Sequence, residues 1–166
     1  MIFKMYNDIF SAMFSYYSGD IKRIQHFIKV HTFAKLIGEN ENISPETQNI
    51  LEIASIVHDI GIKNSELKYH STAGKYQETE GGSEAEKLLS SLGYPDNITE
   101  RVKFLVEHHH TYSNIDGIDW QILLEADFIV NACEDNLSEQ TIRKAMERFF
   151  RTDAGINLLC TVFDIQ

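Results

Sequence analysis

ILEIASIVHDIG, residues 50–61, is an apolar run that ends in a histidine and an aspartate. Ser44, followed by a proline and a glutamate, is a complete helix start signal, so a helix is expected up to His58 or Asp59, with Gly61 ending it. An imidazole and a carboxylate at the buried end of a helix are costly unless a partner satisfies them. A metal ion is a common partner of this kind, so further ligands are expected on other helices.

The composition predicts one helical domain. A chain of 166 residues, 43% of them hydrophobic, can bury a full core, and we expect a single domain over residues 1–166. Proline and glycine are scarce, with 2 and 9 copies, and no segment alternates as a strand does. The fold class expected is therefore all-α, a single-domain helical bundle. Helices are predicted over residues 2–17, 20–37, 44–59, 83–92, 98–109, 119–133, 138–150 and 153–163. The expected N-caps are Asp20, Ser44, Ser83, Asp119 and Ser138. Residues 62–80 are polar and aperiodic and are predicted to form a long loop.

Charge and hydropathy exclude several classes of partner. The formal net charge of −10 argues against a nucleic-acid polymer. No uncharged run approaches the roughly 20 residues of a membrane span, and the N-terminal segment lacks a cleavage signature. The two cysteines, Cys133 and Cys160, lack metal-type spacing, which favours a reducing, cytoplasmic location.

Helical phase brings several polar residues to inward faces. At about 100° per residue, His26, His58, His109 and Asp127 each fall on or near the apolar stripe of a different helix, and Asp59 adjoins one of them. Taken singly, each histidine is more often a core residue bonded to a main-chain carbonyl. Several such groups pointing inward together favour a shared divalent ion, which resolves their burial cost at once.

The order His26, then His58 and Asp59, then Asp127 resembles the HD-domain superfamily of metal-dependent phosphohydrolases. The signature of that superfamily is H…HD…D on an all-helical bundle. The flanking sequences that agree are RIQH at 23–26, ASIVHDIG at 54–61, AGKYQE at 73–78 and HHHTYSNIDG at 108–117. The last two are similar to a subgroup of small stand-alone HD proteins, mostly predicted hydrolases. The resemblance covers residues from about 20 to 160, with the helix over 2–17 preceding it.

The resemblance implies that His26, His58, Asp59 and Asp127 bind one divalent metal ion. Iron, manganese, nickel, cobalt, zinc and magnesium all remain open. Such an ion would lower the pKa of a bound water and polarise a phosphoryl oxygen. Asp59, with His58, is the expected catalytic residue, because it could both ligate the ion and orient that water.

A second metal position is left open by the resemblance. Some HD proteins hold a second ion with additional histidines. At the first of those places this chain has Glu80, and at the second it has His109, with His108 beside it. These three residues are therefore expected either to bind a second ion or to line the pocket. Lys63 follows the central motif near the place where nucleotidase-type members carry an acidic residue, so their water-activating arrangement is not transferred.

Cations are needed for a phosphorylated substrate. Arg23, Lys63, Lys75 and Tyr76 are the candidate substrate contacts, although such cations are more often plain surface charges and Tyr76 can equally be an exposed loop aromatic. The expected partner is a small phosphorylated molecule. The aromatic N-terminal helix could also provide a homodimer surface.

Three functions are compatible with these residues. The first is a metal-dependent phosphohydrolase acting on a nucleotide or another small phosphoester. The second is a di-iron oxygenase, since a minority of HD proteins perform oxidative chemistry. The third is a non-catalytic module that binds a nucleotide or a metal. Metal stoichiometry and phosphate release distinguish the three.

Overall fold

Helix α3 (Pro45–Val57) runs through the middle of the fold, and every residue from Ile50 to Val57 is buried. The computed structural model describes residues 6–166. Ser44 caps α3 by accepting a hydrogen bond from the main-chain N–H of Thr47 at 3.1 Å, and Pro45 occupies the first turn. The start of the central helix is therefore as the sequence predicts.

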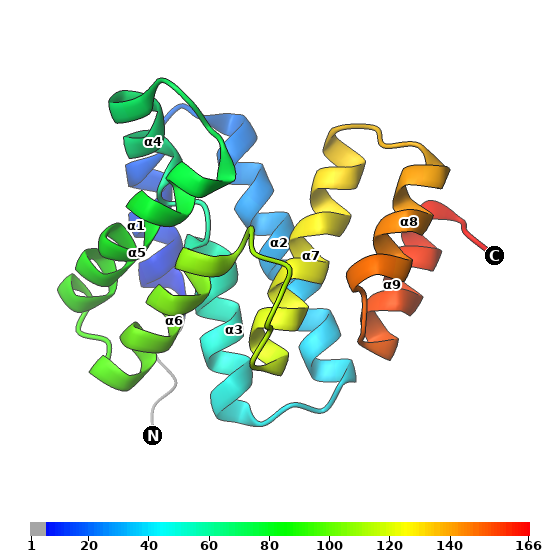
Figure 1. Cartoon of the computed structure of the whole chain (residues 1–166). Helices are drawn as coiled ribbons and strands as arrows, with labels where there is room; N and C mark the ends of the chain where they lie inside the picture. The colour runs from blue at the N-terminus through cyan, green and yellow to red at the C-terminus, as the bar shows by residue number, and fades with distance from the viewer. Residues whose placement is uncertain (1–5) are drawn as a thin grey trace.

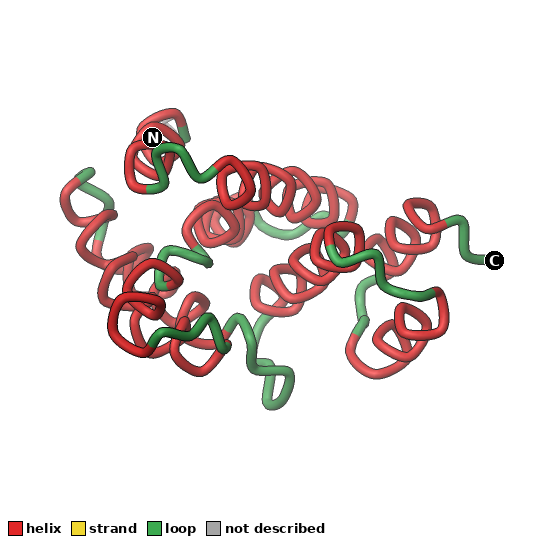
Figure 2. The backbone as a smooth tube through the Cα atoms, turned by 90° about the horizontal axis from the view of Figure 1, so that it is seen from above, coloured by secondary structure: helices red, strands yellow, loops and turns green. Residues whose placement is uncertain are grey.

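The all-α fold class is confirmed, because the described residues form nine helices and no strand (Figure 1). The helices are α1 (Asn7–Tyr16), α2 (Ile21–Asn40), α3 (Pro45–Val57), α4 (Ile62–Tyr69), α5 (Gly74–Ser91), α6 (Asp96–His108), α7 (Ile118–Glu134), α8 (Glu139–Phe149) and α9 (Asp153–Phe163). Short turns join most of them, as the tube in Figure 2 shows. None of the described helices is long and apolar enough to cross a bilayer.

The packing order of the helices places the site. Helix α2 packs against α3 and α7, α3 also packs against α6 and α7, and α5 pairs with α6 and α4. Helices α8 and α9 lie at the opposite side of Figure 1 from α1, α4 and α5, with α9 in contact with α2 and α7. The centre where α2, α3, α6 and α7 meet is filled by one apolar cluster. Polar side chains from α2, from α7 and from the turns after α3 and α6 face one another beside that cluster.

The predicted loop over residues 62–80 is wrong. The segment forms α4 and the first part of α5, which begins at Gly74 rather than after Ser83. These helices bury small and polar side chains such as Ser65 and Gln77, so no apolar periodicity marks them. Gly81 lets α5 approach α6 closely, since a Cβ there would lie 2.7 Å from Val106 Cγ1.

Other boundaries shift by smaller amounts. Helix α2 continues past the predicted end at residue 37 to Asn40, and Gly117 rather than Asp119 is the N-cap of α7. The predicted caps Asp20 and Ser138 are confirmed, each accepting a hydrogen bond from the main-chain N–H three residues on. Of the predicted helix over 2–17, residues 2–5 lie outside the described part of the chain.

Candidate metal centre

The chain turns directly after α3, and this turn presents the histidine and aspartate of the central motif. His58 is fully buried and donates from Nδ1 to the main-chain oxygen of Ser55 at 2.8 Å. The main-chain N–H of Ile60 donates to Val57 O at 2.9 Å, which closes the turn. These bonds satisfy carbonyls that the helix end leaves without partners. Nε2 of His58 is therefore the ring nitrogen that meets side chains from other helices, with His26 Nε2 3.3 Å away.

Four side chains from two helices and this turn place their donor atoms together. His26 comes from α2 and Asp127 from α7, and the two join His58 and Asp59. The Nε2 atom of His26 lies 3.1 Å from Asp127 Oδ1, 3.3 Å from His58 Nε2 and 3.4 Å from Asp59 Oδ2. His58 Nε2 lies 3.4 Å from Asp127 Oδ1 and 3.5 Å from Asp59 Oδ1. The structure therefore brings together all four residues that the sequence selected.

A carboxylate behind His26 fixes the direction of its ring. Nδ1 of His26 lies 2.9 Å from Glu134 Oε2, while Lys29 Nζ lies 2.6 Å from the other oxygen of Glu134. Since Nδ1–H donates outward to Glu134, Nε2 of His26 points to the centre, as it does in His58. A carboxylate–histidine pair of this kind is the usual outer support of a histidine that binds metal.

The donor set fits a divalent ion. Ligand atoms held at about 2.1 Å from one ion lie about 3.0 to 3.4 Å apart, depending on coordination angle. The observed separations of 3.1–3.5 Å come close to that range. Two imidazoles and two carboxylates suit iron, manganese, zinc and related ions. The described residues His26, His58 and Asp59 thus form a group that could bind a metal.

The buried imidazoles and carboxylates of the centre shift the pKa values of one another. Burial lowers the pKa of His26, but its hydrogen bond with Asp127 and the charges around it raise that pKa to about 9. Burial raises the pKa of Asp59, yet the facing imidazoles, with His58 foremost, hold it well below its usual range. Hydrogen bonds with His26 and His58 likewise hold the pKa of Asp127 low against the effect of its burial. Without a metal, a proton on His26 therefore takes the cation's place between ionised carboxylates.

A second group of possible ligands shares Asp59. His109, at the end of α6, and the following His110 have donor atoms close to the Asp59 carboxylate. His109 Nδ1 donates to Val106 O at 2.7 Å, and its Nε2 lies 3.3 Å from Asp59 Oδ1. That Nε2 is buried and, apart from this contact with the Asp59 carboxylate, has no partner among the described residues. A buried nitrogen lone pair without a donor is what an additional ligand position requires.

The other two residues expected near a second ion lie elsewhere. Glu80 accepts hydrogen bonds from Lys68 Nζ at 2.6 Å and from Tyr69 Oη at 3.0 Å. These bonds connect α5 to α4. His108 stacks on Phe104, with ring centroids 4.1 Å apart, and bonds the main chain of the same residue. His110, which sequence reasoning missed, takes the position in the second group. The change in chain direction after α6 brings it there, where helical phase no longer applies.

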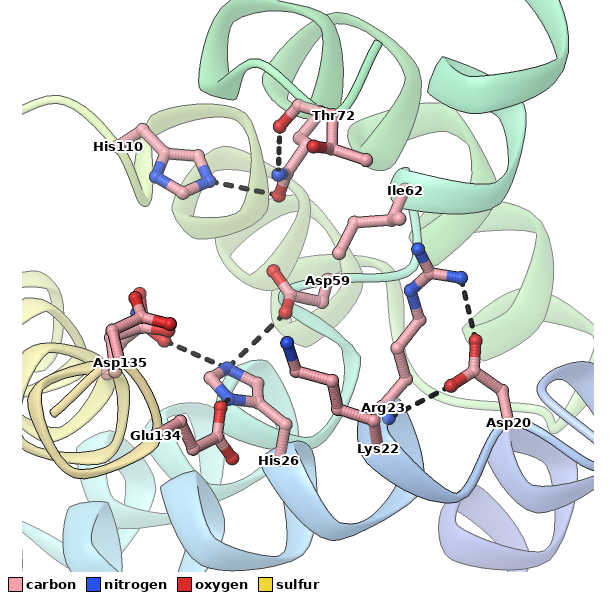
Figure 3. A pocket seen from close by; sticks show the side chains of 13 residues that line it. Asp20, Lys22, Arg23, His26, Asp59, Ile62, Thr72, His110, Glu134 and Asp135 are labelled. Carbon is pink, nitrogen blue, oxygen red and sulfur yellow. Dashed lines mark hydrogen bonds and ion pairs between the residues drawn. The ribbon is translucent and has the colours of Figure 1, made fainter. Parts of the chain in front are cut away.

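A pocket of 450 Å³ opens onto the centre (Figure 3). Among the described residues that line it, five are acidic and two are basic. The acidic residues are Asp20, Asp59, Asp127, Glu134 and Asp135, and the basic residues are Lys22 and Arg23. His110 lies across the pocket from His26 and bonds Gln77 Oε1 at 2.9 Å. The size suits a small molecule, and the lining favours cations over anions.

The predicted substrate contacts divide between pocket and exterior. Arg23 lines the pocket, but its guanidinium is held by Asp20 Oδ2 at 2.7 Å and Glu66 Oε1 at 2.6 Å. Lys22, which the sequence did not single out, extends into the pocket in Figure 3. The other three expected contacts are absent from the described lining and lie on or beside aromatic rings. Lys63 lies over Tyr16, Lys75 lies over Tyr76, and Tyr76 stacks on Tyr69.

Comparison with known proteins gives one match. The family model described as HD domain matches residues 23–151, which is most of the chain. No curated protein and no solved structure matches the chain. The matched segment includes His26, the turn after α3 and Asp127.

Proposed function

Because this chain belongs to the HD domain family, we propose that it is a metal-dependent phosphohydrolase that cleaves a small phosphoester, such as a nucleotide, with a metal-activated water. The family places it within a superfamily of metal-dependent phosphohydrolases. The observation that carries the proposal is the convergence of His26, His58, Asp59 and Asp127 at the floor of a pocket of small-molecule size.

The residues of the centre have separate tasks in this proposal. These four side chains would hold a divalent ion, which would supply a water of lowered pKa and a positive charge for the phosphoryl oxygen. His26 and His58 present Nε2 lone pairs, since their Nδ1 atoms face Glu134 and a main-chain carbonyl. Asp59 contributes a carboxylate at the pocket surface, where it would orient the attacking water.

The acidic lining makes substrate binding dependent on the metal. With five acidic and two basic residues described around the pocket, a phosphate is repelled until a cation is bound. Lys22 and Arg23, about one turn before His26, add positive charge on one wall, with Arg23 partly neutralised by its two carboxylate partners. We therefore expect phosphate compounds to bind the metal-loaded protein far more strongly than the metal-free protein.

Elemental analysis and a phosphoester panel test this function. The protein as purified is analysed for bound metals and then assayed for phosphate release from nucleotides and other small phosphoesters. Asp59→Ala is expected to lose both metal and activity, whereas Asp96→Asn, at an exposed position on α6, keeps both. An Asp59→Ala variant with full metal content and full activity would show that the site is misassigned.

One observation favours a second candidate, a di-iron oxygenase. Asp59 belongs to both ligand groups, so the arrangement of His109 and His110 could hold a second ion. This alternative requires two iron ions per chain and predicts no turnover with redox-inert ions. Phosphate release supported by Mg²⁺ or Zn²⁺ would exclude it.

A further inference from the structure

The turn that carries Asp59 is tied to the end of helix α1. The hydroxyl of Tyr17, the residue after α1, donates to the main-chain oxygen of Asp59 at 2.7 Å. Tyr17 is 4% exposed, so this bond is shielded from water. A second contact lies beside it, where Lys63 Nζ donates to the main-chain oxygen of Tyr16 at 3.3 Å and lies over the Tyr16 ring. Two consecutive residues of the N-terminal segment therefore hold the segment from Asp59 to Lys63.

The same turn also lies against α5. A Cβ on Gly61 would lie 2.4 Å from Gln77 O and 2.7 Å from Gly81 N, both main-chain atoms. Only a residue without a side chain allows this approach. The turn is thus held both by Tyr17 and by the main chain of α5. Its main chain has little freedom while both contacts are present.

The position of this main chain matters because Asp59 belongs to both candidate ligand groups. Its Oδ2 lies 3.4 Å from His26 Nε2, and its Oδ1 lies 3.5 Å from His58 Nε2 and 3.3 Å from His109 Nε2. The Asp59 carbonyl accepts from Ile62 N–H at 3.1 Å as well as from Tyr17. A short side chain such as aspartate follows the direction of its main chain, so a tilt of this peptide would displace the carboxylate from all three imidazoles.

We propose that Tyr17 is a positioning residue for the metal centre, holding the Asp59 peptide so that the carboxylate faces the histidines. The inference rests on the metal site of the proposed function. Tyr17 lies outside residues 23–151, the segment that matches the family, so the N-terminal helix supplies a support that this segment lacks. Partners of this kind, one step removed from the ion, commonly contribute about 10- to 100-fold to metal affinity.

Tyr17→Phe tests the proposal, with Tyr16→Phe as the matched control. Each variant loses one hydroxyl and keeps its ring, and no hydrogen bond of the Tyr16 hydroxyl to Asp59 exists in the described structure. Chelator-treated proteins are titrated with Mn²⁺ by calorimetry, and the visible absorption of Co²⁺-loaded samples is recorded. Tyr17→Phe is expected to raise the Kd for Mn²⁺ about tenfold and to alter the Co²⁺ spectrum. Tyr16→Phe is expected to match the wild type in both.

The outcomes separate this inference from the function on which it rests. If Tyr17→Phe only lowers the melting temperature and keeps the wild-type Kd and spectrum, Tyr17 is a purely structural residue and the proposal is overturned. If the wild-type protein binds no Mn²⁺ or Co²⁺ at all, the metal site itself is refuted, and the positioning role falls with it.

A measurement that retains the hydroxyl covers the case in which Tyr17→Phe does not fold. A single 3-fluorotyrosine is placed at position 17, or at position 16 as control, and Zn²⁺ is added to the metal-free protein. The fluorine resonance at position 17 is expected to shift in proportion to Zn²⁺ occupancy, with a smaller change at position 16. An unmoved resonance at position 17 would refute the link between Tyr17 and the centre.

Discussion

Replacing Glu134 by glutamine removes the negative charge behind His26, and we expect the affinity for Mn²⁺ to fall about tenfold. Glu134 Oε2 lies 2.9 Å from His26 Nδ1, so its charge favours the ring orientation that directs Nε2 to the centre. Supports of this kind are worth about 10- to 100-fold in metal affinity. The lower end applies here because the Glu134 side chain is 15% exposed and shares its charge with Lys29. A tenfold loss corresponds to about 1.4 kcal/mol.

Calorimetric titration of the chelator-treated protein with Mn²⁺ measures this loss. Glu139→Gln on α8, where the glutamate is 64% exposed and pairs with Arg143, is the control and is expected to leave the Kd unchanged. Glu134→Ala, which also removes the acceptor for Nδ1–H, is expected to weaken binding further, toward 100-fold. Wild-type affinity in both Glu134 variants would refute the role given to this carboxylate.

Three further expectations follow from particular contacts. Affinity for Mn²⁺ should rise about tenfold per pH unit up to about pH 9, because the pKa of His26 is raised from 6.5 to about 9 and its proton competes with the ion. A pH-independent Kd would contradict this assignment. The same proton stabilises the metal-free fold fully below pH 6.5, and this stabilisation is lost as the pH rises through about 9. The free energy of unfolding of the metal-free protein should therefore fall between pH 6.5 and 9. Gly61→Ala should lower the free energy of unfolding by about 1–3 kcal/mol in urea titrations, since the added Cβ meets main-chain atoms of α5, and unchanged stability would argue against that close approach. Glu125→Leu leaves two main-chain N–H groups between α8 and α9 without their acceptor. It should lower the free energy of unfolding by about 2–4 kcal/mol in the same titration. A loss below about 0.5 kcal/mol would count against this role of Glu125.

Much of the centre could be placed from the sequence because its ligands lie on helices with clear apolar stripes. His26 on α2 and Asp127 on α7 have buried apolar neighbours one turn away, so a 3.6-residue period gives their direction. Glu134 is not among the predicted residues, although the same 3.6-residue period gives its direction. It lies seven residues after Asp127 on the face of α7 that lines the pocket, and the predicted helix ended one residue too early.

The remaining errors have a physical cause in α4, α5 and the end of α6. The inward faces of α4 and α5 are built from small or polar residues, such as Ser65 and Gly81, which leave no hydrophobic period in the sequence. Lys75 and Tyr76 were therefore assigned to a pocket-lining loop that does not exist. His110 lies two residues beyond the end of α6, so its direction depends on contacts with α5 that helical phase cannot supply.

Anomalous diffraction from crystals soaked in Mn²⁺ tests the central claim most directly. The account predicts an anomalous peak between His26 Nε2, His58 Nε2 and the carboxylates of Asp59 and Asp127, and no peak there in Asp59→Ala crystals. A wild-type structure in which manganese binds elsewhere, or in which these four side chains stay hydrogen-bonded to one another at saturating Mn²⁺, would contradict it.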